Sequence, residues 1–264
     1  MSARLLNLAG ATVQVFANPE DARRAAAEEV ARVIRRASQT RARAAIGLAT
    51  GSTPVPVYER LVAMHKGGEL SFSGVSTFNL DEYYPISPAD PRSYRSYMDR
   101  HLFRHVDLAP NRTHVLDGTV PESFVAEHAA LFDRMIAAEG GLDFQLLGVG
   151  RNGHIGFNEP TQMPVDEALK LPTRSVVLHP VTLADAAGEF GDSASVPLRA
   201  LTLGVAPILA ARSILVLAFG ARKAEPLARA LTGPMTAELP ASLLQHAAGR
   251  VTWMVDEAAA GGLD

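Results

Sequence analysis

Segments with the pattern of β-strands and segments with the pattern of α-helices alternate along most of this chain. Short apolar runs indicate strands, and apolar residues repeating with a period near 3.6 indicate helices. The predicted strands span residues 12–16, 44–49, 75–80, 114–116, 144–148, 175–178, 201–205, 214–219 and 251–255. The predicted helices span residues 20–37, 54–66, 93–103, 123–139, 221–231 and 241–246. Because parallel neighbours need long crossover connections, this order predicts an α/β fold with a mostly parallel sheet covered by helices on both faces.

The composition is that of a globular α/β protein, and we expect residues 1–264 to form a single domain. Zero cysteines exclude disulfides and thiolate chemistry and are expected for a cytoplasmic protein. The net charge is -3, and the sequence therefore predicts no basic surface that would bind nucleic acid. No apolar stretch approaches the roughly 20 residues of a membrane span, and we read no secretory signal at the start of the sequence.

Polar side chains follow three of the predicted strands directly. The three segments read AAIGLATGSTPVPVY, VSTFNLDEYYP and FQLLGVGRNGHIGFNEP, and they begin at residues 44, 75 and 144. Because the carboxyl ends of parallel strands meet at one edge of a sheet, we expect these segments to share a pocket for a small molecule. The irregular stretch 161–172 follows the third segment and has the length of a functional lid.

The first segment contains a loop that suits an anion. Thr50, Gly51, Ser52 and Thr53 lie between an apolar strand and a helix that starts near Pro54. Backbone N–H groups and hydroxyls at such a helix start can converge on a phosphate, although the same residues also favour a plain cap and tight turn. The loop lacks the GK[ST] ending of a Walker A sequence, which favours a phosphate monoester over a nucleotide triphosphate.

The second and third segments supply titratable groups. Adjacent carboxylates at Asp81 and Glu82 would point in different directions, so we expect at most one to face a ligand while the other meets backbone donors. The alternative is a pair of carboxylates in a solvated loop. His154 follows two glycines and precedes Glu159 by five residues, an arrangement suited to acid–base chemistry. The seven other histidines lack such company, and neither the HxH nor the HExxH spacing of a metal site occurs, so we expect no bound metal.

Taken together, these motifs resemble one known family. TGSTP, FNLDEYY, GVGRNGHIGFNEP, LTLGV and FGARKA occur in an order, from about residue 13 to about residue 255, that resembles glucosamine-6-phosphate deaminase, also called glucosamine-6-phosphate isomerase. The resemblance implies a three-layer α/β/α fold with a modified Rossmann-like sheet. It also implies that D-glucosamine 6-phosphate and water give D-fructose 6-phosphate and ammonia without a cofactor. A monomer or a symmetric homo-oligomer would fit the family.

The resemblance also assigns residues. Asp81 matches the base that moves a proton between C2 and C1 of the open-chain sugar. His154 matches the histidine that assists ring opening, and Glu159 the carboxylate that works beside it. The residues that match the family's phosphate site are Thr50, Gly51, Ser52, Thr53 and Lys223.

The chain departs from the commoner family pattern at three places. Asn152 stands where many members have aspartate, so an amide that can orient the histidine ring replaces a charge that would polarise it, and we expect His154 to rely more on Glu159. Glu189 lies in a segment where some members carry a phosphate-binding arginine. Val176 is apolar at a position near Arg174 where allosteric members are basic, which argues against that regulation.

Three alternatives remain open from the sequence. A 6-phosphogluconolactonase shares the implied fold but usually lacks FNLDEYY and the trailing FNEP. A sugar-phosphate-sensing regulator would bring a helix-turn-helix, and the first 40 residues show only one helix. A deaminase of another amino-sugar phosphate, such as galactosamine 6-phosphate, is the closest competitor because no motif reads the C4 hydroxyl.

Overall fold

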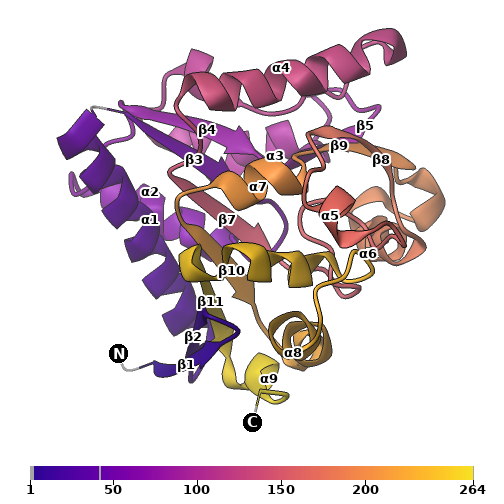
Figure 1. Cartoon of the computed structure of the whole chain (residues 1–264). Coiled ribbons are helices and arrows are strands. Elements are labelled where there is room, and N and C mark those ends of the chain that lie inside the picture. Colours follow the sequence, from indigo (N-terminus) through magenta and orange to yellow (C-terminus); the bar gives the residue numbers. More distant parts are fainter. Residues whose placement is uncertain (1–2, 42, 264) are drawn as a thin grey trace.

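The computed structural model describes residues 3–41 and 43–263, and in that part of the chain an eight-stranded sheet runs through the centre of the molecule (Figure 1). Its strands, in the order β1-β2-β11-β10-β7-β3-β4-β6, are parallel to their neighbours except at the β1–β2 edge. Their bounds are Arg4–Leu8 for β1, Ala11–Phe16 for β2, Ala44–Leu48 for β3, Val75–Asn79 for β4, Thr113–His114 for β6, Phe144–Gly148 for β7, Ile214–Ala218 for β10 and Val251–Asp256 for β11.

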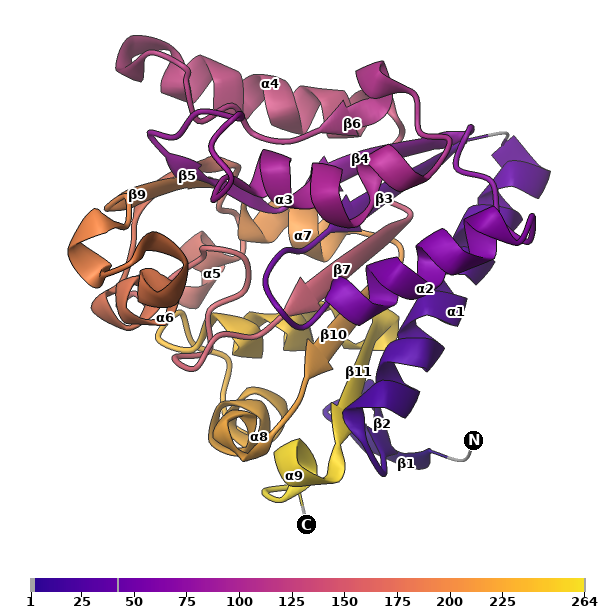
Figure 2. The same ribbon diagram turned by 180° about the vertical axis from the view of Figure 1, so that it is seen from behind.

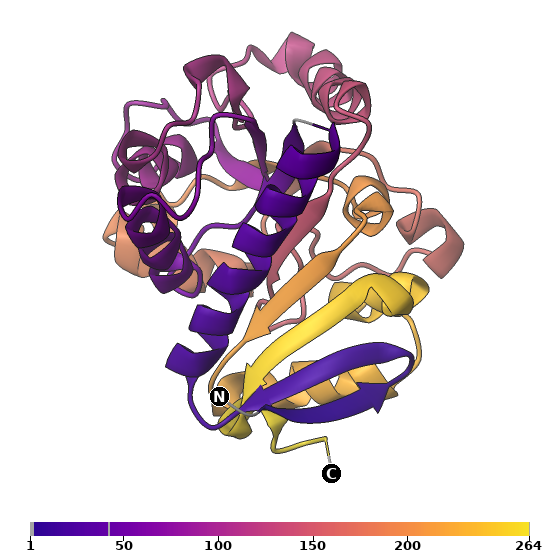
Figure 3. The same ribbon diagram turned by 90° about the vertical axis from the view of Figure 1, so that its left-hand side faces the viewer.

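Helices cover both faces of this sheet, which confirms the predicted three-layer α/β/α fold. One face carries α1 (Pro19–Arg41), α2 (Val55–Lys66) and α3 (Tyr94–His101), which lie in front of the sheet when it is seen from behind (Figure 2). The other face carries α4 (Val125–Ala138), α7 (Val205–Ala210) and the 3-10 segment η6, and a side view separates the two layers (Figure 3). The bounds of η6 are Pro240–Arg250, and α8 (Ala224–Thr232) packs against it. None of the helices in the described part of the chain could cross a membrane.

A smaller antiparallel sheet corrects one part of the prediction. It has the order β5-β9-β8, with β5 at Asp81–Tyr84, β9 at Arg199–Thr202 and β8 at Arg174–Val177. The sequence predicted strands close to β8 and β9 but assigned them to the parallel sheet, and it missed β5 altogether. This sheet lies with α5 (Val165–Ala168) and α6 (Pro180–Phe190) on the right of Figure 1.

The boundary between the two sheets is the single residue Leu80. Its N–H donates to the carbonyl of Leu48 in the large sheet at 3.0 Å, and its carbonyl accepts from the N–H of Leu203, just after β9, at 2.6 Å. The apolar run of β4 therefore continues into β5 while the partner strand changes. Hydrophobicity alone cannot signal that exchange, because Leu80 and the side chains on both sides of it are buried.

The strand order also determines where a ligand can enter. From β3 the chain proceeds to β4 and β6 on one side, whereas from β7 it proceeds to β10 and β11 on the other. Loops that leave neighbouring strands in opposite directions open a crevice at the carboxyl ends of those strands. The residues that follow β3 and β7 lie at this switch point.

Candidate active site

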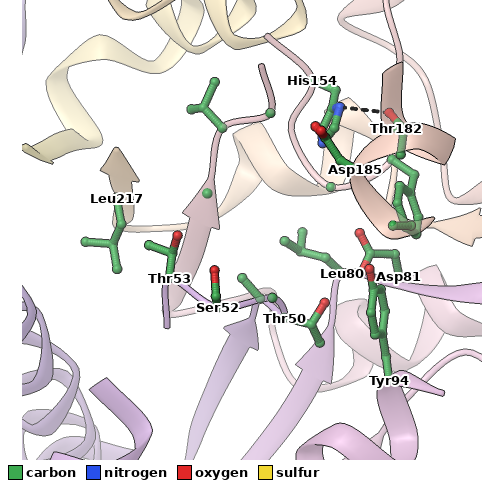
Figure 4. A pocket seen from close by; sticks show the side chains of 18 of the residues that line it. Thr50, Ser52, Thr53, Leu80, Asp81, Tyr94, His154, Thr182, Asp185 and Leu217 are labelled. Atoms are coloured by element: carbon green, nitrogen blue, oxygen red, sulfur yellow. Dashed lines mark hydrogen bonds between the residues drawn. The ribbon is translucent and has the colours of Figure 1, made fainter. Parts of the chain in front are cut away.

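A cavity of about 260 Å³ occupies the switch point, and all three predicted segments contribute to it (Figure 4). Among its lining residues are Asp81, His154 and Lys223, together with the loop 50–53. Asp81 and His154 face the same space from two different elements. The prediction that separate strand ends meet at one pocket is therefore confirmed.

The loop from Thr50 to Thr53 forms one wall of the cavity, where Figure 4 shows three hydroxyl-bearing side chains along it. Gly51 has φ +91°, a conformation that favours glycine, and its carbonyl accepts a hydrogen bond from the Tyr97 hydroxyl at 2.7 Å. Pro54 precedes the first turn of α2. The loop is thus held at the start of a helix, as an anion site requires.

Lys223 reaches the cavity from a different strand end. It closes the short 3-10 turn η5 (Ala221–Lys223) after β10, and its ammonium donates to the carbonyl of Val149 at 2.7 Å. Burial lowers the pKa of Lys223 from its usual value, and the charge of nearby Asp185 opposes that change. The cation therefore lies against the end of β7 and faces the cavity.

Asp81 and Glu82 point in opposite directions, as predicted, and both are buried, so the solvated-loop alternative is wrong. Burial, followed by the charge of Glu82, raises the pKa of Asp81 well above its usual value. Glu82 accepts hydrogen bonds from the backbone N–H groups of Tyr83, Tyr94 and Arg95, each at 2.9 Å. Burial nonetheless raises the pKa of Glu82 to about 7, against those three hydrogen bonds. Asp81 alone of the pair lines the cavity.

The loop that carries His154 packs directly against Asp81. Gly156 has φ +56°, and a Cβ atom there would lie 3.3 Å from Asp81 Oδ2 and 3.2 Å from Thr202 Oγ1. Its lack of a side chain lets the loop approach the carboxylate closely. Phe157 then donates its backbone N–H to Thr202 Oγ1 at 3.0 Å, which ties the loop to β9.

His154 pairs with Glu159 across the turn of this loop. The Nδ1 atom of His154 lies 3.5 Å from Glu159 Oε2 and 3.3 Å from Thr182 Oγ1. Burial tends to raise the pKa of Glu159, but hydrogen bonds and charge from His154, followed by hydrogen bonds from Thr182 and Asn152, lower it to about 2. The imidazole therefore has beside it a carboxylate whose ionised form is favoured.

Asn152 contacts the carboxylate and not the imidazole ring. Its Nδ2 atom donates to Glu159 Oε2 at 3.0 Å, and its Oδ1 atom accepts from the backbone N–H of His154 at 3.2 Å. The sequence interpretation, in which this amide orients the imidazole directly, is corrected accordingly. An uncharged side chain suits this place because Glu159 accepts its N–H group, which an aspartate could not supply.

The helix α6 covers the cavity, and the sequence analysis missed it. Thr182, Asp185, Ala186 and Glu189 of this helix line the cavity. The stretch 161–172, expected to be a lid, contributes no lining residue within the described chain. A signal for α6 was present: His179 caps it and Pro180 occupies its first turn, where proline is favoured.

These features alone define the class of protein. A cavity at the carboxyl edge of an α/β/α sheet, lined by an anion-type loop and by Asp81 and Lys223, whose pKa values burial shifts, is the arrangement of an enzyme that uses acid–base chemistry. Within the described residues, no group of three or more His, Cys, Asp or Glu side chains could hold a metal ion.

The chain belongs to the family described as glucosamine-6-phosphate isomerases/6-phosphogluconolactonase, whose family model matches residues 17–253. Among curated proteins, glucosamine-6-phosphate deaminase of Rhodopirellula baltica is 46% identical over 219 residues, covering 83% of this chain and 84% of that protein. The deaminase of Halothermothrix orenii is 43% identical over 215 residues, covering 81% of this chain and 86% of that protein.

Solved structures agree with this assignment. A monomeric glucosamine-6-phosphate deaminase superposes with a TM-score of 0.87 at 36% identity, covering 95% of this chain and 99% of that one. A 6-phosphogluconolactonase from Trypanosoma brucei superposes with a TM-score of 0.75 at 19% identity, covering 96% of this chain and 98% of that one. The second likeness extends to the fold alone.

Gly150 offers a test of how the imidazole is held. A Cβ atom at this position would lie 2.2 Å from His154 Cε1, so Gly150→Ala must displace the ring. We expect kcat to fall roughly 100-fold, because a shift of about 1 Å in a reacting group has that effect. The matched control is Gly249→Ala, where nothing lies within 4 Å of the added atom. Equal kinetics for the two variants would show that the ring position is unimportant.

The raised pKa of Glu82 leads us to expect that the stability of the protein depends on pH. The unfolded chain releases this proton near pH 4.5, whereas the folded protein retains it to about pH 7. This group's contribution to stability is therefore full below about pH 4.5 and is lost as the pH rises through about 7. In urea unfolding across that range, Glu82→Gln should flatten the fall in unfolding free energy by on the order of 3 kcal/mol. Glu225 is exposed, and Glu225→Gln should give the same dependence of unfolding free energy on pH as the wild type. The same dependence in Glu82→Gln would contradict the assignment.

Proposed function

We propose that this chain isomerises and deaminates D-glucosamine 6-phosphate, giving D-fructose 6-phosphate and ammonia. The observation that carries the proposal is the meeting of an anion-type loop, the buried carboxylate of Asp81 and the imidazole of His154 in one cavity, with Glu159 beside the imidazole. Its support from relatives is that curated proteins 41–46% identical to the chain over most of their length are named glucosamine-6-phosphate deaminase.

In this proposal the phosphate occupies the end of the cavity formed by the loop 50–53 and Lys223. Thr50, Gly51, Ser52 and Thr53 offer hydroxyls and backbone N–H groups at the start of α2. Lys223 adds a positive charge from the other side of the switch point. A dianionic phosphate would also oppose the fall in the pKa of Lys223 that burial causes, so binding and lysine protonation would support each other.

Asp81 is proposed to transfer the proton between C2 and C1 of the open-chain sugar. A base for this step should have a pKa near the working pH, and burial raises the pKa of Asp81 toward that range. Glu82 supports the role indirectly, because its carboxylate is held by backbone N–H groups and points away from the cavity. One carboxylate therefore performs the chemistry and its neighbour secures the turn.

His154 is proposed to open the pyranose ring by moving a proton from the C1 hydroxyl to the ring oxygen. Glu159 lies beside Nδ1 and stays ionised, which stabilises the imidazolium that forms when the ring takes a proton. Asn152 keeps Glu159 in place. Isomerisation then forms an imine at C2, and water displaces ammonia there, so the whole sequence consists of proton transfers and hydrolysis and needs no redox cofactor.

The alternative substrates have less support from the relatives, which are named for glucosamine 6-phosphate. The 6-phosphogluconolactonase structures share the fold at about the 20% identity level, which supports no shared substrate. Galactosamine 6-phosphate differs from the proposed substrate only at C4. It enters the same cavity in principle, and a direct comparison of the two sugars decides between them.

We also propose that residues 1–264 act as one domain in the cytoplasm and that one chain suffices for activity, whether or not it forms a homo-oligomer. The support is that Asp81, His154, Lys223 and the loop 50–53 line one cavity of a single chain, with Glu159 and Asn152 of the same chain beside His154. A similar solved deaminase is described as monomeric.

The activity is tested with the purified chain. Incubation with glucosamine 6-phosphate should release ammonia and fructose 6-phosphate in equal amounts, with a kcat/KM well above that for galactosamine 6-phosphate. Turnover of galactosamine 6-phosphate alone would assign the other sugar. Hydrolysis of 6-phosphogluconolactone without ammonia release would move the chain to the lactonase branch of the family.

Asp81→Asn tests the proposed base. The substitution keeps the shape and removes the proton acceptor, so we expect kcat to fall by roughly 100-fold or more while substrate binding, measured by calorimetry, stays within a few-fold. Asp166→Asn on the exposed surface of α5 provides the matched control. Loss of binding with the chemical step intact would make Asp81 an anchor for the sugar and not its base.

A further inference from the structure

Thr182 lies where the first turn of α6 meets the imidazole of His154. The helix is capped by His179, and Thr182 is its third residue. The side chain is 5% exposed, and its Oγ1 atom lies 3.3 Å from His154 Nδ1, the contact drawn as a dashed line in Figure 4. A buried hydroxyl normally has a hydrogen-bonding task, and the proposed reaction has not used this one.

The oxygens of Glu159 already have other donors. Oε1 accepts from the backbone N–H of His179 at 3.2 Å, and Oε2 accepts from Asn152 Nδ2 at 3.0 Å. The distance from Oε2 to His154 Nδ1 is 3.5 Å, at the limit for a hydrogen bond. Thr182 Oγ1 is therefore the nearer partner of the ring nitrogen.

A threonine hydroxyl can accept one hydrogen bond and donate another at the same time. Here it can accept the Nδ1 proton of His154 and donate its own proton to Glu159. A hydrogen bond from Thr182 is one of the causes that lower the pKa of Glu159. With a proton fixed on Nδ1, the neutral ring has a free lone pair on Nε2, which is the atom left for proton exchange with a ligand.

The backbone around the ring leaves it little freedom. His154 lies directly over Gly150, where even one added carbon would come within 2.2 Å of Cε1. The same helix that carries Thr182 is fastened to the neighbouring loop by the ion pair of Arg151 and Asp185, with Arg151 Nε donating to Asp185 Oδ2 at 3.0 Å. Thr182 is thus presented to His154 by a helix attached at two points, His179 and Asp185.

We propose that Thr182 is a positioning residue whose hydroxyl accepts the Nδ1 proton of His154 beside Glu159 and so holds the imidazole in the Nδ1–H form. The inference deepens the proposed function, on which it rests for the role of the ring in catalysis. The tautomer itself is a property of the free protein. It can therefore be measured whether or not glucosamine 6-phosphate is the substrate.

The test compares Thr182→Val, which keeps the shape and loses the hydroxyl, with Thr182→Ser, which keeps the hydroxyl. Nitrogen-15 NMR of the free protein should show His154 protonated on Nδ1 in the wild type and in Thr182→Ser, and a mixture of tautomers in Thr182→Val. With glucosamine 6-phosphate, Thr182→Val should lower kcat by roughly 10- to 100-fold with little change in KM and shift the pH–rate profile. Thr182→Ser should recover most of kcat.

The control is Thr232→Val, which removes a hydroxyl that donates to a helix carbonyl in α8, outside the cavity. An Nδ1–H tautomer retained in Thr182→Val would overturn the proposal. Equal loss of kcat in the valine and serine variants would overturn it as well, because packing of the methyl group would then explain the effect. Absence of all turnover in the wild type would refute the proposed function, while the NMR comparison would still decide the role of Thr182.

Discussion

A carboxylate kept charged in a buried position is the interaction on which this site depends. Glu159 is only 8% exposed, yet its pKa is lowered by the hydrogen bond and charge of His154, followed by hydrogen bonds from Thr182 and Asn152. The backbone N–H of His179 also donates to it. Removing any donor would leave a buried charge short of a partner, which is among the more destabilising changes a protein can undergo. The loop after β7 and the start of α6 are thereby locked to each other through one side chain.

This arrangement explains why helix and loop must be considered together. His154 comes from the loop and Thr182 from the helix. Thr182 contacts His154 Nδ1, and the same nitrogen lies 3.5 Å from Glu159 Oε2. Asp81 comes from the other sheet and joins them only because Gly156 permits close approach. The geometry of the site is therefore set by short-range contacts between elements far apart in the sequence.

Much of the fold could be predicted from the sequence because the central strands are apolar throughout and are bounded by clear helix signals. The strands β3, β7 and β10 fall within a residue or so of their predicted ends. The small sheet could not be predicted, since an apolar run does not reveal which strand it will pair with. The edge strand β1 was also missed; all five of its side chains are exposed or half-buried, although three of them are leucines.

Some residues of the candidate site could likewise be predicted from the sequence and others could not. Asp81, His154 and the loop 50–53 follow strands, so their meeting could be inferred from parallel topology. Thr182 and Asp185 sit on a helix whose approach depends on the small sheet, and nothing local in the sequence places it. The hydrogen-bonding partner of Asn152 could not be predicted either. An amide can bond to the imidazole of His154 or to the carboxylate of Glu159, and the sequence does not distinguish the two.

Leu80 has a further consequence. Leu80 lies between β4 and β5, is hydrogen-bonded to Leu48 of the large sheet and to Leu203 just after β9 of the small sheet, and lines the cavity, which is therefore a joint between the two sheets. A molecule that touches the loop 50–53 and Asp81 at once would bridge that joint and resist its opening. A sugar bound in the cavity should then reduce the mobility of the small sheet, including parts of it that no atom of the sugar touches.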